Sequence, residues 1–183
     1  MKVESKSVTL KNGRQVILRS AAPSDAENIL RHLRITHAES YKNLNQSVQH
    51  WNNFSASDEE KILADFENSA AKFMLVAFYE DRIVGGLGFW GYQAEFVKRS
   101  AGIGMSIQKE FCGSGLGTEM MNYTLVQAKQ MKFHRIDLTV RTFNEAGIKL
   151  YEKVGFERVG LLKDAAFIDG EYVNEYSYQK ILG

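Results

Sequence analysis

The stretch Cys112-Gly113-Ser114-Gly115-Leu116-Gly117-Thr118 decides the fold of this chain, because its three alternating glycines separate a strand-like segment from a helix-like one. Glycine lets the backbone turn its N–H groups toward a ligand, and a helix that follows adds the positive end of its dipole. The loop therefore predicts a cradle for a phosphate or pyrophosphate group.

Two periodic patterns flank this loop. Upstream, apolar residues alternate with small or polar ones, a period of two that predicts a strand carrying Ala101, Ile103, Met105 and Ile107 on one face. Downstream, apolar residues recur at helical spacing, which predicts an amphipathic helix with the stripe Leu116, Met120, Met121, Thr124, Leu125, Ala128 and Met131. The cradle is thus expected at a strand-to-helix turn.

Three kinds of phosphate loop share this setting. A P-loop requires Lys followed by Ser or Thr after its last glycine, whereas Thr118-Glu119 follows Gly117 here. A dinucleotide fingerprint requires glycine at position 118, and the chain after the loop is too short for a second nucleotide half. The spacing of Cys112 to Gly117 resembles the coenzyme A loop of the GNAT N-acetyltransferase superfamily. Cys112 stands where that loop usually carries Gln or Arg.

A second motif strengthens this resemblance. The run Asn144-x-x-Gly147-x-x-x-Tyr151-x-Lys153-x-Gly155-Phe156 is similar to a signature of the branch that contains ribosomal-protein N-terminal and polyamine acetyltransferases. Gly147 replaces the usual Ala. Further segments that look like this branch are His37 to Tyr41, the range 81–88 and the Asp169-Gly170-Glu171-Tyr172 turn, so the resemblance spans nearly the whole chain.

The remaining segments predict an α/β chain. Strand-like segments are expected at 7–10, 15–19, 73–79, 83–90, 101–107, 135–140, 156–168 and 171–182, the first two joined by Asn12-Gly13. Helices are expected after Ser24 or Asp25, from a capping box formed by Ser57 and Glu60, and after Asn144. The range 37–53 shows no clear period. The resemblance implies a mixed, mostly antiparallel, seven-stranded twisted sheet with helices on both faces, in a single domain over 1–183.

Composition limits the classes of protein. The chain has 183 residues, 44% hydrophobic and 25% charged, as in ordinary soluble domains, and its net charge of +1 offers no electrostatic case for binding nucleic acid or an acidic membrane. It contains no apolar run of transmembrane length and no signal-peptide core. The single cysteine excludes internal disulfides and fits a reducing compartment, so a cytoplasmic location is expected.

Acetyl transfer from a thioester to an amine requires a held cofactor, a polarised carbonyl, a neutral amine and a protonated leaving thiolate. The resemblance implies that acetyl-CoA is held by Cys112, Gly113, Ser114, Gly115, Leu116, Gly117 and Thr118. It also implies that Met105, Ser106 and Ile107 pair with the pantetheine arm, with the Met105 N–H polarising the thioester. Tyr151 would be the general acid, and Asn144 would bind the pantetheine amide while capping its own helix.

The sequence does not identify a single residue as the general base. Glu39 lies in the range that would line the acceptor side, and Glu95 precedes the glycine strand; either one attracts a cationic amine, or is a solvated surface group. No metal-ligand cluster is visible. Gly102 and Gly104 mark close approach of a ligand, or else a bulge or a packed helix. Five aromatic residues either line an acceptor pocket or pack in the core: Tyr41, Trp51, Phe54, Trp90 and Tyr92.

The sequence therefore predicts an acetyl-CoA-dependent N-acetyltransferase that acts by direct transfer in a ternary complex. The acceptor is expected to be a primary amine of a small metabolite, a polyamine or a protein N-terminus. Three alternatives remain open, namely an enzyme for a larger acyl group that the Gly102/Gly104 face would accommodate, a non-catalytic coenzyme A-binding module and a protein-interaction domain. A homodimer is compatible with the resemblance, and sequence alone does not decide it.

Overall fold

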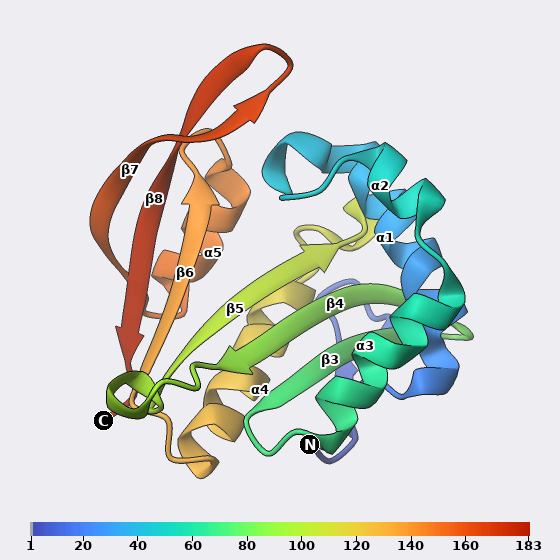
Figure 1. Ribbon diagram of the computed structural model, residues 1–183. Helices are drawn as coiled ribbons and strands as arrows, with labels where there is room; N and C mark the ends of the chain where they lie inside the picture. The colour runs from blue at the N-terminus through green and yellow to red at the C-terminus, as the bar shows by residue number, and fades with distance from the viewer. Residues whose placement is uncertain (1) are drawn as a thin grey trace.

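The computed structural model describes residues 2–183, and its centre is one sheet with the strand order β1-β2-β3-β4-β5-β6-β8-β7 (Figure 1). All neighbouring pairs are antiparallel except β5 and β6. The strands are β1 (Lys6–Thr9), β2 (Gln15–Ser20), β3 (Lys72–Tyr79), β4 (Arg82–Gly91), β5 (Ser100–Ile107), β6 (Arg135–Arg141), β7 (Glu157–Ile168) and β8 (Glu171–Ile181).

The sheet has eight strands, which corrects the seven that the resemblance implied. Every strand-like segment of the sequence joins it, including both arms of the N-terminal hairpin. That hairpin turns at Asn12-Gly13, where Gly13 has a φ of 82° and its N–H donates to the carbonyl of Leu10 (2.9 Å). Gly13 is the member of this dipeptide with a positive φ, a conformation that glycine adopts without strain.

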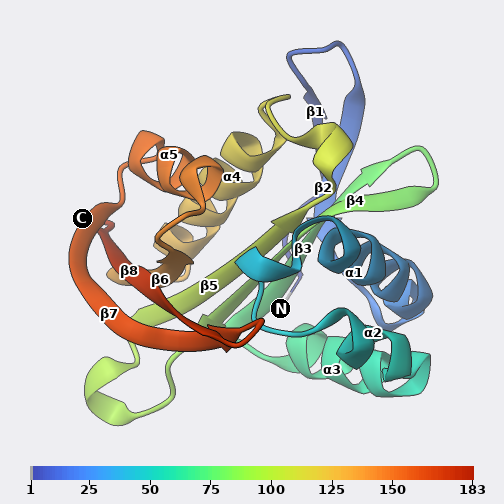
Figure 2. The ribbon, with the colours of Figure 1, turned by 90° about the horizontal axis from the view of Figure 1, so that it is seen from above.

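Helices cover both faces of the sheet, as expected (Figure 2). One face carries α1 (Ala26–Ser40), α2 (Val48–Asn53) and α3 (Ala56–Asn68), and the other carries α4 (Leu116–Gln130) and α5 (Glu145–Lys153). The predicted stripe of α4 is buried against the sheet at Leu116, Met120, Met121, Thr124 and Ala128. The 3.6-residue period of that segment therefore identified both the helix and its inner face.

Two helix boundaries differ from the sequence prediction. The range 37–53, which has no clear period, contains the end of α1 and all of α2, a short helix capped by the Ser47 hydroxyl. In α3 the cap is Ser55, whose hydroxyl accepts from the Asp58 N–H (3.1 Å), so the predicted cap at Ser57 was wrong. Both serines have an acidic residue three positions later, and the sequence pattern alone does not distinguish them.

The feature that shapes the molecule is the short contact between β5 and β6. These strands pair in parallel only where Ser100–Gly102 faces Arg135–Asp137. Beyond this contact β6 continues along β8, while β5 continues along β4 alone (Figure 1). The two strands diverge like the arms of a V, and the edge of β5 from residue 103 to residue 107 has no strand beside it on that side.

Glu59, buried in α3, generates a prediction about stability. Burial raises the pKa of Glu59 to about 7, so the folded protein keeps a proton that the unfolded chain releases near pH 4.5. The free energy of unfolding should therefore fall as pH rises from about 4.5 to 7, by up to about 3 kcal/mol. Glu59→Gln cannot ionise and should lose this dependence.

Urea denaturation at pH 5 and pH 8 measures the effect. The free energy of unfolding of Glu59→Gln minus that of the wild type should be larger at pH 8 than at pH 5. Glu60→Gln, at an exposed neighbouring position of the same helix, is the matched control. An equal difference between Glu59→Gln and wild type at both pH values would contradict the assignment.

Candidate active site

A cleft of about 1070 Å³ opens where β5 and β6 diverge. Three sets of residues line it: the glycine loop before α4, the unpaired edge of β5, and the facing sides of β6, β8 and α5. Of the predicted site residues it brings together Met105, Ser106, Ile107, Cys112, Gly113, Gly115, Gly117, Thr118, Asn144 and Tyr151. The two sequence motifs, which are about thirty residues apart, thus meet at one cleft.

The glycine loop presents N–H groups that have no acceptor within the described chain. These groups belong to Gly113, Gly115, Gly117 and Thr118. Gly113 and Gly115 have φ values of 75° and 94°, a left-handed conformation that other residues adopt only at a cost. Gly115 is the N-cap of α4, so the helix dipole adds its positive end at the same place. The loop can therefore donate several hydrogen bonds to an anion.

The other predicted members of the loop are arranged differently. The N–H of Cys112 donates to the carbonyl of Lys109 (3.0 Å), within the turn that precedes the loop. The hydroxyl of Ser114 donates to the carbonyl of Phe111 (2.6 Å), and the side chain of Leu116 is wholly buried. Neither Ser114 nor Leu116 lines the cleft. Ser114 and Leu116 therefore stabilise the shape of the loop from the side that faces away from the cleft.

Three lysines surround this end of the cleft, namely Lys11, Lys149 and Lys153. The Lys153 ammonium donates to the hydroxyl of Thr118 (3.3 Å). Lys11 comes from the N-terminal hairpin, and its backbone N–H donates to the carbonyl of Ser114 (3.0 Å), which ties the hairpin to the loop. Lys11 is a site residue that sequence reasoning missed, because no local pattern relates it to a loop one hundred residues away. Its charge adds to the attraction for phosphate.

The unpaired edge of β5 aims its backbone into the cleft. At one end of the β4–β5 ladder the Tyr92 N–H donates to the carbonyl of Ser100, and at the other the Gln108 N–H donates to the carbonyl of Val84. Because pairing alternates along an antiparallel ladder, the even-numbered residues of β5 face β4. The N–H and C=O groups of Met105 and its odd-numbered neighbours therefore face the diverging side, where no strand accepts them.

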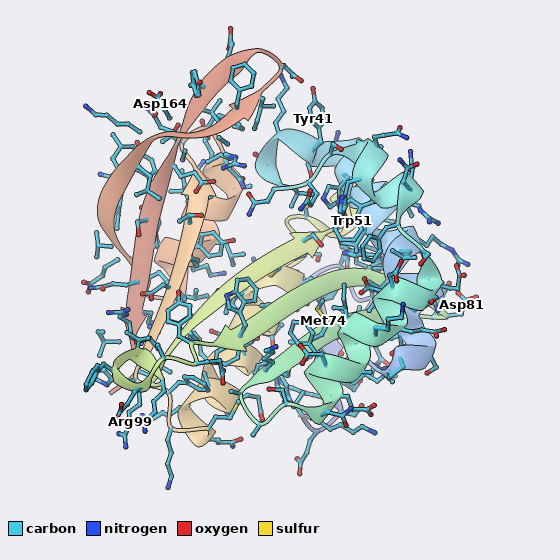
Figure 3. The ribbon with its side chains drawn as sticks, viewed as in Figure 1. Tyr41, Trp51, Met74, Asp81, Arg99 and Asp164 are labelled. Atoms are coloured by element: carbon cyan, nitrogen blue, oxygen red, sulfur yellow. The ribbon has the colours of Figure 1, made fainter. Side chains whose placement is uncertain are left out.

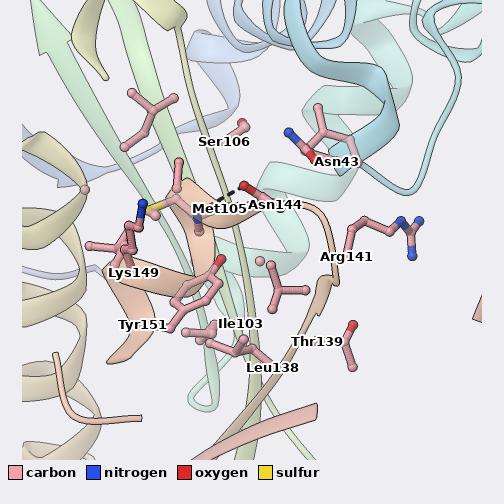
Figure 4. A pocket seen from close by; sticks show the side chains of 18 of the residues that line it. Asn43, Ile103, Met105, Ser106, Leu138, Thr139, Arg141, Asn144, Lys149 and Tyr151 are labelled. Carbon is pink, nitrogen blue, oxygen red and sulfur yellow. Dashed lines mark hydrogen bonds between the residues drawn. The ribbon is translucent and has the colours of Figure 1, made fainter. Parts of the chain in front are cut away.

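Tyr151 projects from α5 into the cleft (Figure 4). Its ring packs near Phe156 and Tyr178, with centroid distances of 6.1 and 6.5 Å, and its hydroxyl makes no hydrogen bond to any described residue. Burial raises the pKa of Tyr151 to about 12, so the phenol keeps its proton at neutral pH. A protonated phenol without an internal partner is available to donate to a ligand.

Asn144 caps α5, as expected from its sequence. Its Oδ1 accepts from the N–H of Gly147 (3.0 Å), and the side chain also lines the cleft (Figure 4). A Cβ at Gly147 would lie 2.9 Å from the Asn144 amide nitrogen. The glycine that replaces the usual Ala therefore gives the capping side chain its room.

Glu39 lies outside the large cleft. Its carboxylate accepts from the N–H of Lys109 (2.8 Å), and the residue lines a separate, smaller hollow beside α5. Glu95, the other candidate base, is exposed in a short turn and does not line the cleft either. The structure thus brings Tyr151 to the expected place and leaves both predicted carboxylates elsewhere.

Trp90 explains the glycines of β5. Trp90 lies opposite Gly102 in the ladder, and its indole covers Gly88, Gly102 and Gly104 on the same face of the sheet. A Cβ at Gly102 would collide with the indole, and one at Gly104 would lie 3.3 Å from it. The β4–β5 ladder has no register shift here and a side chain, not a helix, covers the glycines, so the interpretations as a bulge and as a packed helix were wrong. Gly102, Gly104 and Trp90 all line the cleft, and the close approach of a ligand stays a prediction.

The other predicted aromatic residues divide into two groups. Tyr92 lines the cleft with Trp90, whereas the rings of Trp51 and Phe54 pack edge-on or tilted against each other and against His50, beside α1. Tyr41 reaches the tip of the β7–β8 hairpin, where its hydroxyl donates to Asp169 (2.8 Å) (Figure 3). Only two of the five therefore contribute to the cleft.

The wall opposite Trp90 is polar, and its charges are paired. On β6, Arg135 pairs with Asp137 (3.0 Å). Arg141, labelled in Figure 4, is buried. It forms an ion pair with Glu175 of β8 and donates to the side chain of Asn45 (3.1 Å). Between these pairs lie the uncharged side chains of Thr139, Ser177 and Gln179. This side of the cleft thus offers hydrogen bonds with little net charge.

Two negative observations apply to residues 2–183. In this range no group of three or more His, Cys, Asp or Glu side chains is arranged to hold a metal ion. No helix in the same range combines the length and apolar character needed to cross a bilayer.

Comparisons with known proteins agree with this geometry. A family model described as "Acetyltransferase (GNAT) family" matches residues 39–156. An L-amino acid N-acetyltransferase of Escherichia coli is 30% identical over 108 residues, which cover 58% of this chain and 67% of that protein. An N-alpha-acetyltransferase of Saccharolobus solfataricus is 26% identical over 160 residues, 87% of this chain and 90% of that protein.

Solved structures share the fold. An acetyltransferase of the GNAT family from Streptococcus pneumoniae superimposes with a TM-score of 0.86 at 24% identity, covering 92% of this chain and 99% of that one. A protein from Salmonella typhimurium, determined with its cofactor acetyl-CoA, superimposes with a TM-score of 0.76 at 13% identity, covering 92% of this chain and 94% of that one.

The loop offers a matched pair of variants. Gly113 has a positive φ and open space where a side chain would go, and Asn and Asp are the residues that best tolerate this conformation. Gly113→Asp adds a negative charge beside the free N–H groups, and Gly113→Asn adds the same shape without charge. Calorimetric titration with coenzyme A should show binding roughly tenfold weaker for Asp than for Asn at low salt, with a smaller difference at high salt. Equal affinities would show that no phosphate lies near this loop.

Proposed function

The chain belongs to the acetyltransferase (GNAT) family and is an N-acetyltransferase that uses acetyl-CoA as the acetyl donor, and we propose that it acetylates a primary amine by direct attack in a ternary complex. One observation carries this proposal. The free N–H groups of the loop, the unpaired edge of β5 and the hydroxyl of Tyr151 all face one cleft. Direct transfer requires donor and acceptor in one place, and the cleft has room for both.

The residues present fit acetyl-CoA. In the proposed complex the pyrophosphate accepts from the N–H groups of Gly113, Gly115, Gly117 and Thr118, with the surrounding lysines as counter-charges. The pantetheine arm runs along β5 and pairs with its outward-facing backbone groups in place of a strand. The free amide nitrogen of Asn144 is available to the same arm.

The proposed chemistry assigns two groups of this chain. The N–H of Met105 donates to the thioester oxygen and stabilises the negative charge that develops there. The neutral amine forms a bond to the carbonyl carbon, the carbon–sulfur bond breaks, and the phenol of Tyr151 gives its proton to the departing sulfur. The nitrogen of the new amide releases its extra proton to water, and the phenolate of Tyr151 takes up a proton from water, so that the protein returns to its starting state. Because the pKa of Tyr151 is about 12, the proton is present at neutral pH. Glu39 receives no role, because it does not line the cleft.

The acceptor side supports an uncharged or singly charged amine. The ion pairs on β6 and β8 leave no unpaired carboxylate that would attract a polycation such as spermidine. The relatives named above act on L-amino acids or carry the name N-alpha-acetyltransferase. We therefore place an α-amino group, in an amino acid or at a protein N-terminus, before a polyamine.

The test starts with calorimetric titration of the protein with acetyl-CoA, followed by thiol release in the presence of L-methionine, the peptide Ala-Gly-Ser or spermidine. Saturable thiol release with methionine or the peptide would support the proposal. Binding of acetyl-CoA without release for any of the three amines would favour a non-catalytic coenzyme A-binding protein instead.

Tyr151→Phe tests the acid. The variant keeps the ring and removes the proton donor, so turnover should fall by about 10²-fold or more while the affinity for acetyl-CoA stays nearly the same. Tyr123→Phe is the control, because it removes a phenol hydroxyl from α4 that lies outside the cleft and bonds only to the carbonyl of Glu4. Unchanged turnover in Tyr151→Phe would reject Tyr151 as the acid.

A further inference from the structure

Three polar side chains form a connected group between α1 and the acceptor side of β5. His32 of α1 is 2% exposed, and so is Gln108, which follows β5. Ser106 lies at the end of the group and lines the cleft. The Nε2 atom of His32 is 2.9 Å from the hydroxyl of Ser106, and its Nδ1 is 3.5 Å from the amide nitrogen of Gln108. No motif of the sequence relates these residues, which are up to 76 positions apart.

The orientation of the Gln108 amide is set by its other partners. Its Oε1 accepts from the guanidinium of Arg82 (3.2 Å), and its Nε2 donates to the carbonyl of Ile83 (3.0 Å). A flipped amide would put an oxygen against the Ile83 carbonyl and a donor against Arg82. The amide therefore turns an N–H toward Nδ1 of His32, which acts as the acceptor.

This arrangement assigns the proton of His32. Burial lowers the pKa of His32 to about 4, so the ring is neutral at the pH of a cell. A neutral imidazole that accepts at Nδ1 carries its hydrogen on Nε2. The Nε2–H therefore donates to the oxygen of Ser106. A Cβ at Gly86 would lie 3.6 Å from Nε2 and 3.9 Å from the serine oxygen, which are ordinary van der Waals contacts.

The direction of that hydrogen bond decides what Ser106 can do. Because His32 donates to it, His32 cannot remove the serine proton, so Ser106 is not activated as a nucleophile. Its oxygen keeps one lone pair, and its hydrogen makes no hydrogen bond to any other described residue. As an even-numbered residue of β5, Ser106 shares the face of Trp90, next to Met105, whose N–H enters the cleft.

We propose that Ser106 orients the acceptor amine, and that His32 and Gln108 are positioning residues that act through it. The remaining lone pair of Ser106 accepts an N–H of the neutral amine, which directs the amine's own lone pair toward the thioester carbon. No bond to Ser106 forms and its proton stays in place, so no acyl-serine arises. This inference rests on the proposed function, since it assigns a residue to the same transfer.

Four variants and one control test the arrangement in thiol-release assays with L-methionine or Ala-Gly-Ser. Ser106→Ala should lower kcat/KM for the amine by about tenfold to hundredfold and leave the KM for acetyl-CoA within twofold. His32→Leu should cause a similar loss, and the double variant should be no worse than either one. His32→Gln, whose amide supplies a donor near the position of Nε2, should recover most of the activity. Ser100→Ala removes a hydroxyl from the same face of β5 outside the cleft and should behave as wild type.

A second measurement needs no acceptor. Nitrogen-15 NMR of the histidine side chains should show His32 in the Nε2–H form, without titration between pH 8 and pH 5. The Nδ1–H form would overturn the assignment of Ser106 as a hydrogen-bond acceptor.

The outcomes distinguish a failure of the role of Ser106 from a failure of the proposed function. Two results would overturn the inference and leave the proposed function standing. In the first, Ser106→Ala turns over as fast as the wild type. In the second, the fold-loss of kcat/KM in the double variant equals the product of the losses in the two single variants. A wild-type protein that binds acetyl-CoA and releases no thiol with any amine would overturn the proposed function itself, and with it the role of Ser106 in transfer.

Discussion

The brevity of the contact between β5 and β6 is the constraint on which the rest of the structure depends. Three residues of each strand face each other, after which β6 continues along β8 and β5 has one neighbour. Backbone N–H and C=O groups inside a protein are costly to leave unpaired. A sheet that opens in its middle therefore tolerates its free edge only where water or a ligand reaches it, and an extended ligand with amide groups replaces the absent strand most completely.

Along β5, odd-numbered and even-numbered residues direct their backbone groups and side chains to opposite sides. Its odd-numbered residues turn their backbone toward the opening and their side chains toward α4 and α5, where the loop offers free N–H groups and lysines. Its even-numbered residues turn their side chains to the opposite face, which carries Trp90 and the paired charges of β6. In the proposed complex, donor and acceptor would therefore approach from different faces of the sheet and meet at the level of Met105.

Local sequence patterns predicted the features that depend on residues close together in the chain. The strand and helix around the loop, the Asn144 cap and the position of Tyr151 follow from period, spacing and resemblance, and the structure brings them to one cleft. The sequence patterns could not predict the register of the strands or the contacts between distant segments. The indole of Trp90 over Gly102, the approach of Lys11 to the loop and the contact of Glu39 with Lys109 each join segments that are 12 to about 100 positions apart. The resemblance implied seven strands, whereas the sequence patterns indicated eight strand-like segments, and the sheet has eight.

The group of His32, Ser106 and Gln108 is a part of the interior that packing alone does not explain. A buried imidazole and a buried amide lose their hydration, and apolar side chains of similar volume would fill the same space without that cost. Hydrogen bonds within the group offset much of the cost, and the partners of Gln108 direct one N–H of its amide toward His32. Beyond stability, the group would provide orientation, because the hydrogen bond from His32 fixes the place of the Ser106 oxygen, whose remaining lone pair would be available to an N–H of the proposed acceptor amine. Such a constraint is useful where an amine must attack from one direction, which is the role that the proposed function gives to the part of the cleft lined by Ser106.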